Sequence, residues 1–255
     1  MQPILTIALS QCPVTRGGFQ SNLDHHLTHI EHSAFLGAQL IVFPELSLTG
    51  YELDIANENA LKPSDRIFKD LSKASKNNDI IVIAGCPLAT QSSKPQIGAV
   101  ICFPCGNIEF YSKQYLHDGE EQYCLPGEKD YQFTIGEHKI ALAVCADFSE
   151  PEHSKRAIKK AADVYIASAL ISPSGYQHDA EILSNIAFRH QIPTLLCNHI
   201  STTGGWETCG NNSIWDLNGK LIASSDNNQP GVLLCTMSEV SISGQFYPLT
   251  LDTTA

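Results

Sequence analysis

Glu45, Lys113 and Cys145 stand out because each comes at the end of an apolar stretch and each could take part in nucleophilic chemistry. A thiol at a strand end can be exposed at the top of a sheet, where it can attack a carbonyl carbon. A carboxylate can remove the thiol proton, and a fixed ammonium group can stabilise the oxyanion that forms. The three residues together would suit acyl transfer through a cysteine.

Each of these residues also has an ordinary structural explanation. Exposed glutamates are common in loops, so Glu45 could be a simple surface residue. Lys113 could lay its stem along apolar surface and keep its ammonium group in water. The chain has nine cysteines, and Cys145 could be a small buried hydrophobe like most of the others. What separates Cys145 is the group of acidic residues and the proline behind it, in CADFSEPE.

Taken in order, the stretches FPELSLTGYE, YSKQYL and CADFSEPE resemble three motifs of the nitrilase superfamily of carbon–nitrogen hydrolases. The similarity extends to GAQLIVFPE, KKAADVYIASA, TLLCN and GNNSIWDLNGKL, and so covers most of the chain. The resemblance implies an α/β fold of a particular kind, a four-layer α-β-β-α sandwich with two mixed sheets. It also implies pairing into at least a homodimer.

The resemblance assigns a role to each motif residue. It implies that Cys145 is the nucleophile, Glu45 the general base and Lys113 the oxyanion stabiliser. Glu120 matches a second glutamate of the family, and its neighbour Glu121 is the alternative for that position. The implied chemistry requires no metal and no organic cofactor.

The residues after the nucleophile favour an amide substrate over a nitrile. Family members that hydrolyse nitriles often carry Trp and then Glu there, whereas this chain has Ala146 and Asp147. The backbone N–H of Ala146 is the expected second donor to the oxyanion. The predicted reaction is hydrolysis of a small linear amide through a cysteine acyl-enzyme, with release of ammonia or an amine. Hydrolysis of an N-carbamoyl amide is one alternative, and a non-catalytic interaction module with the same fold is another.

Four further residues are predicted to line the substrate pocket. They are Tyr51 in FPELSLTGYE, Tyr176 in the loop SPSGYQH, and His199 and Trp206 in NHISTTGGWETCG. Glycine-rich loops also serve as packed surface connections, so the segments of the last three residues could equally be structural.

The elements that must position these residues alternate between apolar runs and amphipathic segments. Runs that are apolar nearly throughout are typical of strands covered on both faces. The predicted strands are 4–12, 39–43, 80–86, 97–103, 108–113, 139–145, 164–170, 193–198, 213–217, 220–225 and 231–237. The predicted helices are 22–37, 66–76, 152–162 and 179–190. No linker or repeat is visible, so residues 1–255 are expected to form a single domain with helices outside mixed sheets.

Two polar clusters invite a functional interpretation that their context does not favour. His25, His29 and His32 have a spacing that resembles metal ligands, but they lie roughly opposite the apolar stripe of their predicted helix and are expected to face solvent. Cys102 and Cys105 have a redox-like spacing, but they end a strand and enter a turn instead of opening a helix.

The composition argues against several classes of function. A net charge of −11 is unlike that of a nucleic-acid-binding protein. The longest apolar runs are far shorter than the roughly 20 residues that a membrane-spanning helix needs. The N-terminus lacks the basic segment of a signal peptide, and an odd number of cysteines favours reduced thiols and a cytoplasmic location. The composition thus predicts no nucleic acid and no membrane as partner, and the family resemblance implies a small-molecule amide.

Overall fold

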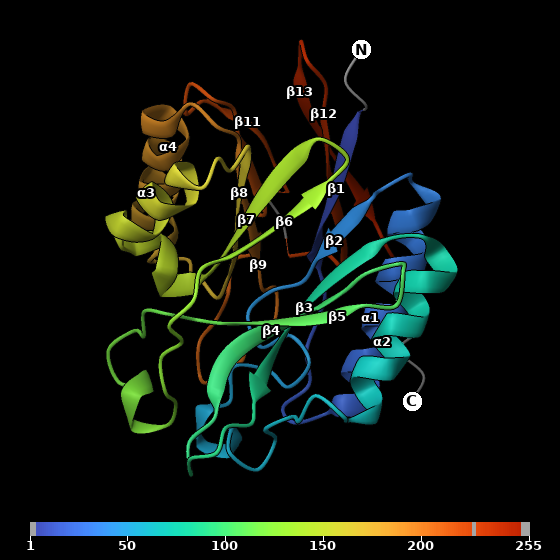
Figure 1. The fold of residues 1–255 in the computed structure, drawn as a ribbon, viewed down its shortest axis with the longest axis vertical. Coiled ribbons are helices and arrows are strands. Elements are labelled where there is room, and N and C mark those ends of the chain that lie inside the picture. The colour runs from blue at the N-terminus through green and yellow to red at the C-terminus, as the bar shows by residue number, and fades with distance from the viewer. Residues whose placement is uncertain (1–3, 226–227, 251–255) are drawn as a thin grey trace.

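The computed structural model, which describes residues 4–225 and 228–250, has two mixed β-sheets stacked face to face. Helices α1 and α2 lie outside one sheet, and helices α3 and α4 lie outside the other (Figure 1). The α-β-β-α sandwich implied by the sequence resemblance is therefore confirmed.

Each sheet has a parallel centre and antiparallel edges. The strands β1, β2 and β3 are parallel in the larger sheet, and β7, β8 and β9 are parallel in the smaller one. The larger sheet has the spatial order β13 (Ile242–Pro248), β12 (Gly231–Met237), β1 (Leu5–Gln11), β2 (Leu40–Val42), β3 (Ile81–Leu88), β4 (Gln96–Cys102) and β5 (Ile108–Ser112). The smaller sheet has the order β11 (Leu221–Ser224), β10 (Ser213–Trp215), β9 (Thr194–Asn198), β8 (Val164–Ala169), β7 (His138–Val144) and β6 (Tyr131–Ile135).

The helices lie where the amphipathic segments predicted them, with shifted ends. They are α1 (Phe19–Phe35), α2 (Arg66–Asn78), α3 (Pro151–Lys159) and α4 (Tyr176–His190), and the short 3₁₀ turns are η1 (Leu53–Ile55), η2 (Glu120–Gln122) and η3 (Cys145–Ser149). Pro151 opens α3, where the missing N–H of proline costs nothing. Helix α4 begins at Tyr176, three residues before the predicted start, so the SPSGYQH segment is only partly a loop.

Two strands were not predicted, because neither gives a continuous apolar run. β6 and β13 are edge strands of their sheets and are only partly buried. Polar residues alternate with apolar ones along both, as is usual for strands with one solvated face.

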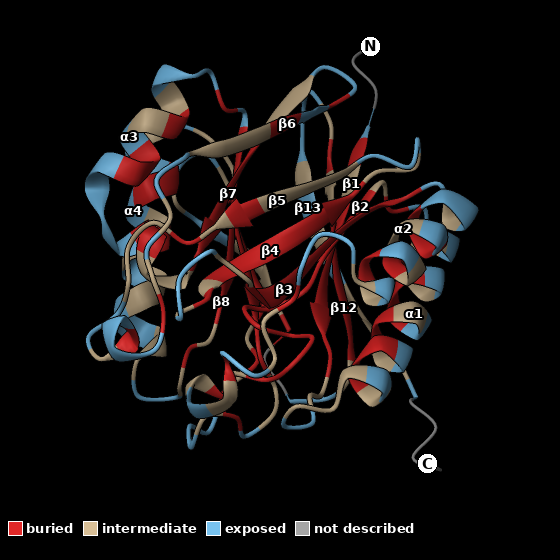
Figure 2. Cartoon of the chain, turned by 60° about the horizontal axis from the view of Figure 1, so that its bottom comes forward, coloured by how far each residue is buried: buried red, intermediate tan, exposed pale blue. Residues whose placement is uncertain are grey.

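Strand β7 shows why the central strands are apolar nearly throughout. Ile140, Leu142 and Val144 point into the core between the two sheets, whereas Ala141 and Ala143 point outward to the helices α3 and α4. Large side chains therefore fill the space between the sheets, and small ones let the helices approach closely. Figure 2 shows the resulting burial, with buried residues along the central strands and exposed residues on the outer faces of the helices.

The prediction that the histidines of the first helix face solvent is wrong for His29. Its side chain is fully buried, and its Nδ1 lies 2.8 Å from the Ser10 hydroxyl oxygen. The adjacent His26 is also buried and stacks on the Phe43 ring with a centroid separation of 3.9 Å. The periodicity argument failed because the sheet offers hydroxyl and aromatic partners that make a polar helix face compatible with burial. Neither histidine belongs to a cluster that could hold a metal ion within the described residues.

All nine cysteines are free thiols in the structure. Cys102 is buried at the end of β4, and Cys105 is exposed in the turn that leads to β5. No described helix is long and apolar enough to cross a membrane.

Candidate active site

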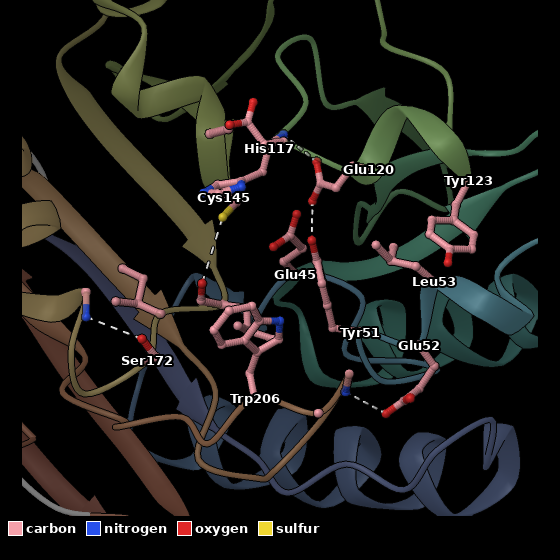
Figure 3. Close-up of a pocket in the computed structure, with 18 of the residues that line it drawn as sticks. Glu45, Tyr51, Glu52, Leu53, His117, Glu120, Tyr123, Cys145, Ser172 and Trp206 are labelled. Atoms are coloured by element: carbon pink, nitrogen blue, oxygen red, sulfur yellow. Dashed lines mark hydrogen bonds between the residues drawn. The ribbon is translucent and has the colours of Figure 1, made fainter.

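Glu45, Lys113, Glu120 and Cys145 lie together although they come from segments far apart in the sequence. The Lys113 Nζ atom is 2.8 Å from Glu45 Oε1 and 2.8 Å from Glu120 Oε1. The two glutamates and Cys145 line a pocket of about 760 Å³, which is the size of a small-molecule site. Figure 3 shows Glu45 between the Cys145 thiol on one side and the Tyr51 and Glu120 side chains on the other.

Glu45 is positioned by a tight turn after β2. The residue after it, Leu46, has a positive φ of 52°, and Leu48 donates its N–H to the Gly85 carbonyl of β3 at 2.9 Å. A side chain at Gly85 would press into the backbone nitrogen of Leu46 and the carbonyl oxygen of Pro44, so only glycine lets this turn approach the sheet so closely. The turn fixes the Glu45 backbone, and its carboxyl group is fully buried.

Cys145 occupies a strained backbone position at the start of η3, directly after β7. Its φ is 45°, a value that is unfavourable for a residue with a side chain. Such a turn at a strand end directs the thiol away from the sheet and into the pocket, where the sulfur lies 3.9 Å from the Leu170 carbonyl oxygen. Ala146, the next residue, also lines the pocket.

Glu120, and not its neighbour Glu121, is the second glutamate of the site. Glu120 is buried, and its Oε1 accepts hydrogen bonds from Lys113 Nζ and from the Tyr51 hydroxyl. Its Oε2 accepts the backbone N–H of His117 at 2.7 Å. Glu121 is exposed and accepts the N–H of Gly119. Of the two neighbours, Glu120 is the one that the structure places in the cluster.

Burial and mutual repulsion set the protonation states of the cluster. The pKa of Glu45 is raised to about 7, because burial, helped by the charge of Glu120, raises it by more than the Lys113 ammonium lowers it. Burial alone would lower the pKa of Lys113, but the carboxylates around it raise the pKa above its usual value. Burial and the two glutamates raise the pKa of the Cys145 thiol well above normal. The resting site therefore holds a charged lysine and a protonated thiol.

The free oxygen of Glu45 is suited to receive that thiol proton. Within the described residues, Glu45 Oε2 has no hydrogen-bond partner of ordinary geometry although it is completely buried. The Cys145 thiol is close enough to influence the pKa of this carboxyl group. One oxygen of Glu45 thus holds Lys113, and the other is left for proton transfer.

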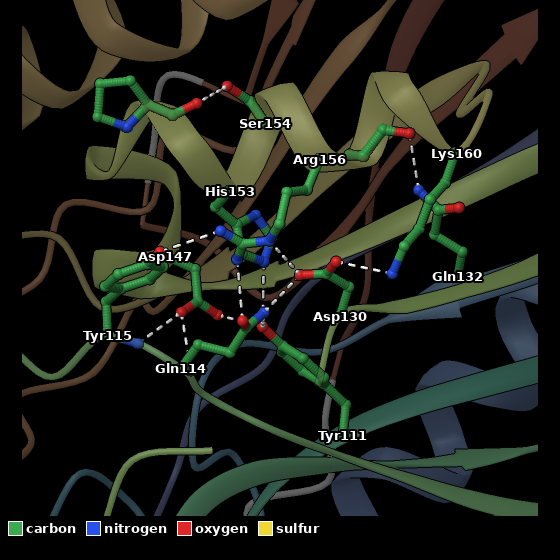
Figure 4. A network of polar contacts seen from close by, with 12 residues as sticks. Tyr111, Gln114, Tyr115, Asp130, Gln132, Asp147, His153, Ser154, Arg156 and Lys160 are labelled. Carbon is green, nitrogen blue, oxygen red and sulfur yellow. Dashed lines mark hydrogen bonds and ion pairs between the residues drawn. The ribbon is translucent and has the colours of Figure 1, made fainter. Parts of the chain in front are cut away.

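Asp147 joins the lysine segment to the cysteine turn. Its Oδ1 accepts the backbone N–H groups of Gln114 at 2.9 Å and Tyr115 at 3.0 Å. Its Oδ2 accepts the N–H of Val144 at 2.9 Å and the Tyr111 hydroxyl at 2.6 Å. The carboxylate is fully buried and lies at the centre of a polar network between the two sheets (Figure 4). This role was not foreseen from the sequence, where Asp147 served only to compare motifs.

Of the residues predicted to line the pocket, Tyr51, Ala146 and Trp206 do so. Burial and the nearby carboxylates raise the pKa of Tyr51, so its hydroxyl stays a neutral donor to Glu120. The Trp206 side chain is 55% exposed at the pocket mouth. Its loop is fastened to the chain after Tyr51, because the N–H of Gly204 donates to Glu52 at 2.8 Å.

His199 and Tyr176 do not lie on the pocket wall of the described structure. His199 is fully buried, and its Nε2 donates to the backbone carbonyl of Glu45 at 2.5 Å. Burial lowers the pKa of His199 to about 4, so the ring is neutral. The Tyr176 hydroxyl is 2.7 Å from the Ser213 hydroxyl, which draws the ring toward β10. The predicted substrate contact of both residues is replaced by a structural contact.

Several lining residues carry no motif that would have revealed them. Arg16, His117, Ser172 and Asp179 all face the pocket but stand in unremarkable sequence contexts. They are brought together by the loops that follow β1, β5 and β8 and by the first turn of α4.

Comparison with known proteins identifies a family for nearly the whole chain. A family model described as carbon-nitrogen hydrolase matches residues 6–243. A 2-oxoglutaramate amidase from Bacillus subtilis is 26% identical over 221 residues, covering 86% of this chain and 85% of that protein. A glutamine-dependent NAD(+) synthetase from Aquifex aeolicus is 22% identical over 92% of this chain, but the match covers only 42% of that protein. A second such synthetase, from Thermotoga maritima, is matched over 39% of its length.

Solved structures share the fold. A mutant of an amidase from Nesterenkonia AN1 superposes with a TM-score of 0.83 at 22% identity, covering 92% of this chain and 91% of that one. A second mutant of that amidase, which carries an acetamide group covalently added at its active-site cysteine, gives a TM-score of 0.84.

Proposed function

This chain belongs to the carbon-nitrogen hydrolase family, and from that premise we propose that it hydrolyses the C–N bond of a small linear amide through an acyl-enzyme on Cys145. The observation that carries the proposal is the convergence of Glu45, Glu120 and Cys145 on one pocket, with the buried Lys113 bound to both glutamates. A thiol, a carboxylate of raised pKa and a fixed cation are the groups that acyl transfer needs.

The first step forms the bond between sulfur and the amide carbon. The free Oε2 of Glu45 takes the thiol proton as the sulfur attacks, and the carbonyl π electrons move to oxygen. The ammonium of Lys113 and the N–H of Ala146 stabilise this oxyanion, and each such donor is worth about 3 kcal/mol of barrier in comparable acyl transfers. Because the pKa of the thiol is raised, proton transfer and attack occur together rather than through a standing thiolate.

The next steps release the amine and then the acid. Protonated Glu45 gives its proton to the leaving nitrogen as the C–N bond breaks, which leaves a thioester on Cys145 and frees ammonia or an amine. A water molecule then gives a proton to Glu45 and attacks the thioester. When the C–S bond breaks, the carboxylic acid departs and the sulfur recovers its proton from Glu45. Glu120 holds Lys113 and Tyr51 in place throughout.

The motif comparison favours an amide over a nitrile, since Ala146 and Asp147 stand where family members that hydrolyse nitriles often carry Trp and Glu. Asp147 is fully occupied by the polypeptide, so its carboxylate shapes the turn and does not meet the substrate. Hydrolysis of an N-carbamoyl amide would use the same steps and would release carbon dioxide as well as ammonia.

An ammonia-release screen over simple linear amides tests the proposal. We expect turnover by the wild-type protein, none by Cys145→Ala, and full activity in Cys105→Ala, whose exposed thiol does not line the pocket. Intact-mass measurement of rapidly quenched wild-type protein should show one acyl group, which is lost in Cys145→Ala. Ammonia release by folded Cys145→Ala at the wild-type rate would refute the proposal, and parallel release of carbon dioxide would point to a carbamoyl substrate.

A further inference from the structure

The wall of the active-site pocket is strongly acidic. The carboxylates that line it are Glu45, Glu52, Asp54, Asp118, Glu120 and Asp179. Among the described lining residues, Arg16 is the only arginine or lysine. Lys113, the other nearby cation, is already held between Glu45 and Glu120.

The single arginine is not free to bind an anionic substrate. Its guanidinium group forms ion pairs with Glu52 and with Asp54. These two contacts occupy both terminal nitrogens of Arg16. A substrate carboxylate would therefore enter a pocket that repels it and offers no available cation.

Asp179 differs from the other acids of the wall. It is half-buried in the first turn of α4, and its carboxylate has no hydrogen bond or ion pair within the described residues. Burial raises the pKa of this carboxyl group, and the nearby His178 and His117 oppose that shift only in part. An acid in the first turn stabilises a helix, but this effect does not require the carboxylate to line the cavity.

Resting on the proposed function, we infer that Asp179 binds a cationic group of the substrate, so that the protein prefers amides that carry an amino group at the far end. The amide would lie at Cys145, where the buried Oε2 of Glu45 has no ordinary hydrogen-bond partner among the described residues. The ammonium group would lie at Asp179 in the same cavity. The exposed ring of Trp206 at the mouth offers a second, weaker attraction for a cation.

Calorimetric binding to the Cys145→Ala protein tests this inference without turnover. Three amides of matched length serve as probes: 4-aminobutanamide, pentanamide and glutaramate, whose ends are cationic, neutral and anionic. We expect the cationic amide to bind most tightly and the anionic one most weakly. An additional Asp179→Asn change should weaken binding of the cationic amide by about ten- to a hundredfold, the range for loss of a hydrogen bond to a charged group.

A matched control on the same helix separates charge recognition from helix stability. Glu181 is exposed on α4, contacts Gln177 and does not line the pocket. Glu181→Gln should leave the ratio of affinities for cationic and neutral amides as it is. The inference is overturned if glutaramate binds as tightly as 4-aminobutanamide, if no binding of the cationic amide is measurable, or if the affinity ratio survives Asp179→Asn.

Turnover measured separately distinguishes this inference from the proposed function. Hydrolysis of the amides without dependence of selectivity on Asp179 rejects the inference and keeps the hydrolase. Binding of 4-aminobutanamide that depends on Asp179, together with no hydrolysis of any amide, keeps the cation site and rejects the hydrolase.

Discussion

The buried position of Glu45 predicts that activity responds to pH in the neutral range. The pKa of this carboxyl group rises from 4.5 to about 7, with burial as the main cause. A shift of that size corresponds to about 3 kcal/mol of preference for the protonated form. Only the ionised form can accept the thiol proton, so kcat/KM should rise with pH and level off above neutrality. Below the pKa it should fall about tenfold for each pH unit.

Removing the charge of Glu120 should shift the pKa of Glu45 in a known direction. Its negative charge raises the pKa of Glu45, so Glu120→Gln should move the acid limb of the pH profile downward. Glutamine keeps an oxygen that can accept from Lys113 and Tyr51, which preserves the geometry as far as one substitution can.

The assay is ammonia release from a neutral amide, with kcat/KM measured from pH 5 to pH 9. A neutral substrate does not titrate in this range, so the limb reports the free enzyme. Cys105→Ala serves as the control and should keep the wild-type profile. A wild-type limb near the ordinary glutamate pKa, or an upward shift in Glu120→Gln, would refute the assignment of Glu45 as the base.

Three further predictions concern the framework of the site. His29 has a pKa of about 3 in the folded protein against 6.5 ordinarily, so acid favours the unfolded chain. Urea titrations of the wild-type protein should therefore show a free energy of unfolding that falls between pH 6.5 and pH 5. In His29→Asn this fall should be smaller by about 2 kcal/mol. Gly85→Ala should displace the turn that carries Glu45 and lower kcat about a hundredfold, with the circular dichroism spectrum of wild type; an unchanged kcat would contradict the close-approach argument. Asp147→Asn replaces a carboxylate that accepts four hydrogen bonds with a side chain that also donates. Steady-state kinetics should show a large fall in kcat with little change in KM. A rise in KM alone would argue against a positioning role.

The local pattern of the chain predicted most of the strands and helices, whereas the four-layer arrangement came from the family resemblance. Strands such as β7 are recognisable in the sequence because both of their faces are covered, which makes them apolar nearly throughout. The residues that end these strands stand out by their place after an apolar run. Glu45, Lys113 and Cys145 were noticed in this way, their roles came from the resemblance to the nitrilase superfamily, and the structure brings them together.

The remaining features depend on contacts between distant segments, which a local pattern does not encode. His29 is buried because Ser10 lies opposite it on β1, a partner nineteen residues earlier in the chain. His199, in the segment after β9, donates a hydrogen bond to the backbone carbonyl of Glu45. Asp179 lines the pocket only because α4 starts beside it. Each of these placements requires the assembled sheets before it can be seen.

The two sheets contribute different halves of the site. Cys145 follows β7 of the smaller sheet, whereas Glu45 and Lys113 follow β2 and β5 of the larger one. The gap between sulfur and carboxylate is therefore set by the thickness of the hydrophobic layer in which Leu142 and Ile83 lie. The side chains packed between the two sheets thus fix how far apart the two halves of the site are held. Substitutions deep in that layer can therefore change the distance between thiol and carboxylate, and with it the reaction rate, without touching the substrate.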